Sequence, residues 1–232
     1  DSVANDLFFV PECLGVKIAL GDHRSSFPTT QQVLALLADI RVGAMIAGKT
    51  GFLHIHMGNI PGAFGMFKAI VETGMPIRHI RPTHCGRIRH VFDAAVEFAK
   101  AGGWIDITTG ASCCFEHPAE AVVAAIDAGV DPSHITLSTD GHGSVPRFNE
   151  KGEMIGLGVG GVDGNLLETK RLIAEHGMPI EEALAFTTKN VGEALGLADQ
   201  GVVKKGACAN ACLFNDAFEL TDVFARGRGM MR

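Results

Sequence analysis

The sequence contains no tyrosine and a single tryptophan, Trp104. Without tyrosine, no phenolic hydroxyl of this chain can donate a proton in catalysis. No apolar run approaches the roughly 18 residues that a membrane-spanning helix needs. The opening residues 1–6 also lack the basic-then-apolar order of a signal peptide. We therefore expect a cytoplasmic protein without a membrane anchor.

Paired cysteine motifs are missing too. The six cysteines form no Cys-x-x-Cys pair, and a chain of this size does not need disulfides, so we expect reduced thiols. Cys208 and Cys212 lie four residues apart with no second pair or nearby histidine, which argues against a structural zinc site. The adjacent Cys113 and Cys114 receive no role from the sequence.

The composition that remains is typical of a globular domain. Of 232 residues, 47% are hydrophobic and 20% are charged, which is enough apolar material for a core. The net charge of −6 argues against a general binder of nucleic acids or membrane surfaces.

Strand patterns alternate with helix patterns along most of the chain. We predict strands at residues 14–20, 51–57, 79–83, 104–109 and 135–140. Helices are predicted at 29–47, 63–72, 89–100 and 118–128. A glycine-rich loop over 141–161 precedes two further helices at 165–176 and 180–195, and short strands follow over 201–231.

This alternation predicts an α/β fold with a parallel sheet covered by helices. A complete (β/α)8 TIM-type barrel takes about 250 residues, whereas only five strand–helix units are visible here. We therefore expect residues 1–200 to form an incomplete barrel whose first strands lie upstream of Asp1.

Side chains able to bind a metal stand at the carboxyl ends of the predicted strands, where such barrels place their chemistry. Neutral imidazoles and a carboxylate suit a hydrolytic divalent metal, zinc first. A buried lysine between small neighbours has room but little solvent, so we expect it to lose its proton readily. Carbon dioxide would then convert it to a carbamate that can bridge two metals. Taken singly, each residue is more often structural; the joint pattern favours a metal site at Lys17, His56, His84 and Asp140.

The motifs around these residues resemble the amidohydrolase superfamily, and within it the bacterial isoaspartyl (β-aspartyl) dipeptidases. The resemblance runs along almost the whole chain and includes Lys17 followed by Asp22-His23-Arg24-Ser25, His56-Met57-Gly58, Pro82-Thr83-His84, and Ser138-Thr139-Asp140-Gly141 with Ser144. It implies a metal-dependent barrel, and it implies that residues 201–232 are C-terminal strands of a small β-sandwich domain.

The same resemblance implies roles for individual residues. Carbamylated Lys17 would bridge two zinc ions, His56 and His84 would hold one of them, and Asp140 would be a ligand and the general acid/base. Arg24, Arg87 and Ser144 would hold the substrate, the arginines on its free α-carboxylate, which suits guanidinium geometry. The implied activity is hydrolysis of β-aspartyl dipeptides, by a protein that is a homo-oligomer at full length and binds no nucleic acid or membrane.

One motif departs from the family pattern. The family's His-x-His belongs to the first barrel strand, but His54-Ile55-His56 lies downstream of Lys17, so we interpret His54 as inner packing or as a neighbour of the ligands. The His-x-His strand itself is absent, as are the family's glutamate and tyrosine from the early strands. We therefore expect these 232 residues to be inactive by themselves.

Two alternatives remain open at this point. One is another binuclear amidohydrolase, dihydroorotase-like or acting on N-acyl amino acids. Substrate profiling would separate it from a β-aspartyl dipeptidase, which needs a free α-carboxylate for its arginines. A non-catalytic truncated barrel would hold at most one zinc ion poorly.

Overall fold

The computed structural model describes residues 2–22, 25–151 and 153–231. The helices are α1 (Val3–Phe9), α2 (Thr30–Ile46), α3 (Ala63–Glu72), α4 (Arg89–Lys100), α5 (Pro118–Asp127), α6 (Gly164–Ala174), α7 (Ile180–Ala185) and α8 (Lys189–Leu195). The strands are β1 (Gly15–Leu20), β2 (Phe52–Met57), β3 (Ile80–Thr83), β4 (Ile105–Thr108), β5 (Ile135–Ser138), β6 (Ser144–Phe148), β7 (Met154–Val159), β8 (Ala211–Phe214), β9 (Leu220–Ala225) and β10 (Arg228–Gly229).

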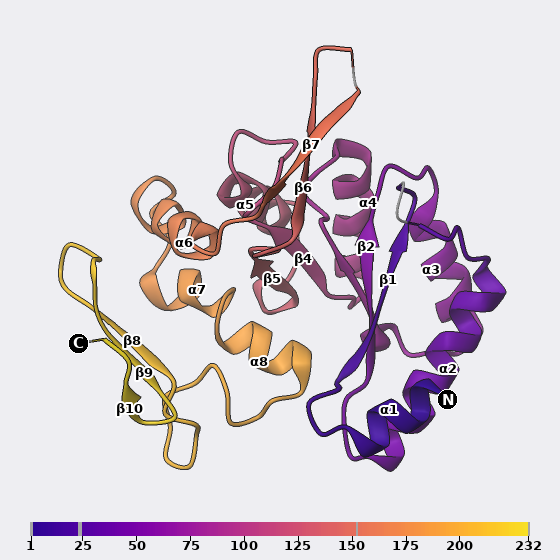
Figure 1. Cartoon of the computed structure of the whole chain (residues 1–232), viewed down its shortest axis with the longest axis horizontal. Helices are drawn as coiled ribbons and strands as arrows, with labels where there is room; N and C mark the ends of the chain where they lie inside the picture. Colours follow the sequence, from indigo (N-terminus) through magenta and orange to yellow (C-terminus); the bar gives the residue numbers. More distant parts are fainter. Residues whose placement is uncertain (1, 23–24, 152, 232) are drawn as a thin grey trace.

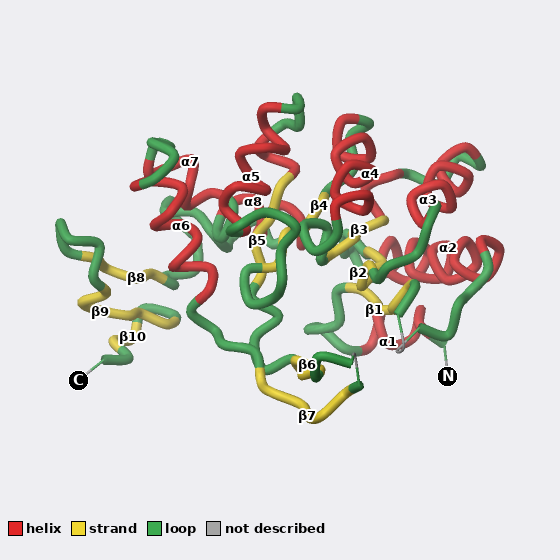
Figure 2. The backbone as a smooth tube through the Cα atoms, turned by 90° about the horizontal axis from the view of Figure 1, so that it is seen from above, coloured by secondary structure: helices red, strands yellow, loops and turns green. Residues whose placement is uncertain are grey.

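The first five strands are parallel and follow one another in chain order along an arc, with α2, α3, α4 and α5 on its outer side (Figures 1 and 2). Strands β1, β2 and β3 form one ladder, and β4 pairs with β5. Between the two ladders the Cys85 amide donates to the Asp106 carbonyl over 3.1 Å. Strands β1 to β5 and their helices thus form five β/α units of an incomplete barrel, as the sequence predicts.

The core lies between this arc and the helices. Helix α2 begins at a capping box, in which Thr29 and Gln32 satisfy each other's backbone amides. Its fully buried Leu37 and Ile40 belong to the same core cluster as Leu53 and Ile55 of β2. Because strand side chains alternate between faces, the residues between these buried positions face the inside of the arc.

The strand register arranges the inward side chains in two rows. Parallel pairing sets Lys17 opposite His54 and His54 opposite Arg81. One step nearer the carboxyl ends, Ala19 pairs with His56 and His56 with Thr83. His56 therefore lies at the carboxyl ends of the strands, as predicted. Lys17, which was expected at a strand end, lies instead one row nearer the amino ends, because it is the third residue of β1.

Two predictions of secondary structure are wrong. Residues 144–159 form an antiparallel hairpin of β6 and β7 rather than a loop, and it projects from the body of the protein (Figure 1). Its turn is closed by Asn149, whose side-chain oxygen accepts from the amides of Lys151 and Glu153. The helix predicted at 180–195 is divided, because the hydroxyl of Thr188 bonds to the carbonyl of Leu184 and its backbone leaves the helical region.

The remaining elements lie at the two ends of the chain. Helix α1 precedes the first predicted strand, and Lys49 holds its C-terminal side by donating to the carbonyl oxygens of Leu7, Val10 and Cys13. The tail forms the small antiparallel sheet β10-β9-β8. None of the helices in the described part of the chain is long and apolar enough to cross a membrane.

Candidate metal and substrate site

His84 follows directly after β3 and turns the chain away from the sheet. Its φ of 64° is a left-handed conformation, which is uncommon for residues other than glycine and often marks functional positions. The side chain is only 1% exposed. Its Nδ1 lies 2.6 Å from Oγ1 of Thr108, and its Nε2 is buried without a hydrogen-bond partner among the described residues.

His56 lies beside His84 at the end of the neighbouring strand β2. The two rings meet edge to face with their centroids 4.3 Å apart. His56 is 5% exposed, and its Nε2 lies 2.6 Å from Oδ2 of Asp22, in the loop after β1. The sequence places Asp22 in the family motif but does not indicate this contact.

Asp140 reaches the same place from the end of β5. It lies two residues beyond the strand, and its φ of 52° is again left-handed. Its Oδ2 is 3.9 Å from Nε2 of His84 and 3.3 Å from a terminal nitrogen of Arg87. Residues of β2, β3 and β5 that are distant in the chain thus converge at one rim.

Burial and neighbouring positive charges set the charge state of His84. Desolvation, followed by the charges of Arg87 and other neighbouring cations, lowers the pKa of His84 from 6.5 to about 2. The ring is therefore neutral at physiological pH. Neutral imidazole with a free lone pair is the form that binds metals.

The prediction that Lys17 is buried is wrong. Its side chain is exposed, because β1 is the edge strand of its ladder in the described part of the chain. It still lines a hollow of about 380 Å³ together with Ala19 and His56. The structure therefore places Lys17 on the same side of the sheet as the histidines, with room around it but with access to solvent.

The other predicted substrate residues are placed unevenly. Arg87 reaches the site, where it contacts Asp140. Ser144 opens β6, four residues after Asp140, and is exposed. Arg24 lies outside the described residues.

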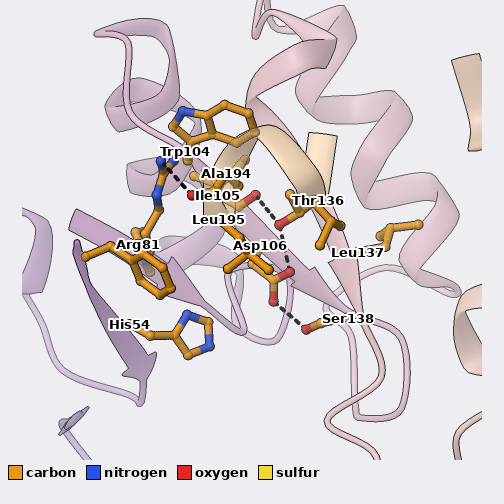
Figure 3. A pocket seen from close by; sticks show the side chains of 13 residues that line it. His54, Arg81, Trp104, Ile105, Asp106, Thr136, Leu137, Ser138, Ala194 and Leu195 are labelled. Atoms are coloured by element: carbon orange, nitrogen blue, oxygen red, sulfur yellow. Dashed lines mark hydrogen bonds between the residues drawn. The ribbon is translucent and has the colours of Figure 1, made fainter. Parts of the chain in front are cut away.

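A layer of hydroxyl groups supports the rim and was not recognised in the sequence. The buried carboxylate of Asp106 accepts hydrogen bonds from Ser138 at 2.6 Å and Thr136 at 2.8 Å (Figure 3). It also accepts one from Thr83 at 2.5 Å, so that β3, β4 and β5 are tied together. Alternation predicts that Asp106 and Thr108 point inward, but their partners lie more than twenty residues away. The sequence carries no local signal for those pairs.

His54 faces a different space from His56. It lines a cavity of about 160 Å³ with Arg81 and Trp104, one step nearer the amino ends of the strands (Figure 3). Burial is the largest effect on His54 and lowers its pKa, with Lys17 acting in the same direction and Asp106 opposing it. This position matches the interpretation of His54 as inner packing.

The donor chemistry at the rim fits a divalent metal. Within the described part of the chain Nε2 of His84 is a buried nitrogen without a hydrogen-bond partner, and the 3.9 Å that separates it from Oδ2 of Asp140 is too long for a hydrogen bond. A cation between such donors would satisfy both. The described residues nevertheless contain no group of three or more histidine, cysteine or acidic side chains arranged as a complete metal site, and Nε2 of His56 is paired with Asp22.

Comparison with known proteins identifies the family. The profile of the amidohydrolase family matches residues 51–230. The structure is similar to a beta-aspartyl dipeptidase from the thermophilic, keratin-degrading Fervidobacterium islandicum AW-1 in complex with the dipeptide beta-Asp-Leu, with a TM-score of 0.91 and 35% identity. A second structure of beta-aspartyl dipeptidase from this organism gives a TM-score of 0.86 and 32% identity.

These matches cover a larger share of this chain than of the related chains. Each covers 100% of this chain but only 62% and 59% of the respective dipeptidase chains. N-acetylglucosamine-6-phosphate deacetylase from Pasteurella multocida, at 13% identity and a TM-score of 0.61, covers 95% of this chain and 57% of its own, and shares the fold alone. The family profile spans more than half of the 232 residues, and the chain therefore belongs to the amidohydrolase family, with the fold of an incomplete TIM-type barrel.

Proposed function

We propose that the protein to which this chain belongs is a metal-dependent hydrolase of β-aspartyl dipeptides. The observation that carries the proposal is the convergence of His84, Asp140 and Arg87 at the carboxyl ends of the strands. The resemblance to a dipeptidase solved with beta-Asp-Leu supports the substrate class. Because the chain spans about three fifths of that enzyme, we assign the activity to a longer polypeptide that completes the barrel.

The metal, zinc in our expectation, would be held by His56, His84 and Asp140, and Lys17 as a carbamate would bridge a pair of ions. When bound, such ions supply a hydroxide at neutral pH and polarise a carbonyl group. The solvent access of Lys17 and the hollow beside it leave space for carbon dioxide to reach the amine. For His56 to bind the metal through Nε2, its present contact with Oδ2 of Asp22 would have to break.

The residues of this chain would orient the dipeptide and move one proton. The carboxylate of Asp140 takes a proton from the attacking water as the new C–O bond forms. It then gives this proton to the departing amine as the peptide C–N bond breaks. The guanidinium of Arg87 contacts Asp140 over 3.3 Å and has further nitrogens that can bind the α-carboxylate of the substrate. Ser144 and Arg24 complete the expected substrate contacts.

The test is an assay of beta-Asp-Leu hydrolysis by the complete polypeptide, with bound metal measured in parallel. Loss of the general acid/base in Asp140→Asn should lower kcat by roughly 10²- to 10⁴-fold while metal remains bound. The control is Asp93→Asn, which alters an exposed ion pair with Arg89 on α4 and should leave the rate unchanged.

Substrate variation tests the role of Arg87. A β-aspartyl dipeptide has two free carboxylates, one on the aspartyl residue and one at its C-terminus, and the two singly amidated dipeptides are compared. Amidation of the carboxylate that Arg87 binds should raise KM in the unaltered enzyme, but should have little further effect in Arg87→Met. Full turnover by Asp140→Asn would contradict the assigned proton transfer. Equal hydrolysis of the free and amidated dipeptides would instead favour a different amidohydrolase substrate.

A further inference from the structure

Two adjacent thiols lie on the loop that connects β4 to α5. Cys113 and Cys114 are both partly exposed and both unpaired. The side chains are close enough for each thiol to affect the ionisation of the other. This pair takes no part in the proposed hydrolysis.

The loop touches the segment that carries the candidate site. The amide of Cys114 donates to the carbonyl of Gly86 over 2.8 Å, and Gly86 stands between His84 and Arg87 in the chain. The sulfur of Cys113 lies 3.5 Å from the position that a Cβ atom on Gly86 would occupy. The backbone of Cys114 and the sulfur of Cys113 therefore lie against the segment that carries His84 and Arg87.

The geometry of neighbouring residues makes a disulfide between these cysteines unfavourable. Their Cα atoms are about 3.8 Å apart across a trans peptide, below the roughly 4.4 Å at which disulfides begin to be found. An atom with longer bonds to sulfur can bridge the same pair without that strain. The pair is thus better suited to chelation than to oxidation.

We propose that Cys113 and Cys114 form a dithiol site that captures trivalent arsenicals, with one arsenic atom bonded to both sulfurs. A monosubstituted arsenical carries two As–OH groups in water. Each reacts with one S–H group, so that two As–S bonds form and two molecules of water leave. No electron is transferred, and no oxidant is required.

The other cysteines do not offer an equivalent pair. Cys85 is fully buried, and Cys13 is directed at the carbonyl oxygen of Gly15. Cys208 and Cys212 lie on the tail, the latter exposed. We therefore expect one arsenic per chain, held at residues 113 and 114.

Ordinary alkylation should distinguish this site from a reactive single thiol. Burial raises the pKa of both Cys113 and Cys114, so little thiolate is present at neutral pH. Iodoacetamide, which needs the thiolate, should modify them slowly, and faster as the pH rises. An arsenical gains from two bonds at once and should still bind.

The experiment treats the native 232-residue chain with phenylarsine oxide and measures intact mass. One bridged phenylarsenic group per chain is expected, reversible with 2,3-dimercaptopropanol. Peptide mapping after denaturing alkylation should show that residues 113 and 114 are protected together. Cys114→Ser should weaken binding by at least tenfold, whereas the control Cys212→Ser should bind as the parent does.

Either of two results would overturn the proposal. One is a chain that forms no bridged adduct; the other is an adduct that maps to Cys208 and Cys212 and disappears in Cys212→Ser. If Cys114→Ser does not fold, the map of the unaltered chain decides by itself. Because no readout is hydrolysis, failure here leaves the proposed function untouched.

Discussion

The hydrogen bond between Thr108 and His84 determines which nitrogen of the imidazole is free, and Thr108→Val tests this. The two residues are 2% and 1% exposed, and Nδ1 lies 2.6 Å from the hydroxyl oxygen. Among the described residues a proton on Nε2 would have no acceptor, because Oδ2 of Asp140 is 3.9 Å away. The proton therefore belongs on Nδ1, where it is donated to Thr108. Valine has nearly the same shape but cannot accept it.

The expected cost follows from one buried donor that loses its acceptor. Such a group destabilises a fold by about 1–3 kcal/mol. Transfer of the proton to Nε2, with a small approach to Asp140, recovers part of this, so we expect about 1–2 kcal/mol. With a urea m-value of roughly 3 kcal/mol/M, the midpoint should fall by about 0.3–0.7 M.

Two measurements check the prediction. Urea unfolding can be followed by the fluorescence of Trp104, the single tryptophan, and nitrogen NMR of the histidine rings reports the proton's position. Thr108→Val should move the proton of His84 from Nδ1 to Nε2, and Thr108→Ser should restore it. Thr221→Val on β9, which removes only an exposed hydrogen bond to Leu213, is the control.

The reasoning would be refuted if the proton of His84 were found on Nε2 in the unaltered chain. It would also be refuted if the proton stayed on Nδ1 in Thr108→Val. In the complete enzyme the same substitution should weaken metal binding by roughly 10- to 100-fold, the usual effect of removing a partner of a ligating histidine.

Two further predictions concern the stability of the chain. Burial lowers the pKa of His79, whose Nδ1 is hydrogen-bonded to the carbonyl of Gly51. Below pH 6.5 the unfolded chain therefore takes up a proton at this histidine that the folded chain does not. The contribution of His79 to the free energy of unfolding should fall by up to about 1.4 kcal/mol per pH unit as the pH is lowered. His79→Asn should reduce the difference in urea midpoint between pH 7.5 and 5.5, and an unchanged difference would exclude His79 as the source. Lys49→Met removes bonds of 2.6–2.8 Å to three carbonyl groups, so amide hydrogens of α1 should exchange at least tenfold faster, unlike in the exposed Lys68→Met. Unaltered exchange would show that α1 is held by its packing on α2 alone. The carbonyl oxygens concerned are those of Leu7, Val10 and Cys13.

Much of the architecture can be predicted from the sequence because its signals are local. The bounds predicted for α3 and α4 agree with the structure, and α2 starts where Thr29 and Gln32 form their capping box. The five parallel strands also appear in the predicted order, since apolar runs between turn residues need no distant partner to be recognised. The side chains that stand at the strand ends can likewise be identified from the sequence alone.

The partners of those side chains were decided by tertiary structure. The contacts of His84 with Thr108 and of Arg87 with Asp140 join residues 24 and 53 positions apart, and their distances depend on how neighbouring strands are registered. The exposure of Lys17 depends on what lies beside β1, which no property of residues 14–20 can reveal. The hairpin of β6 and β7 escaped prediction for a related reason, because the glycines of β7 weaken its local strand signal and the strand is held by its pairing with β6. Sequence thus determined which chemical groups arrive at the rim, and folding determined which of them touch.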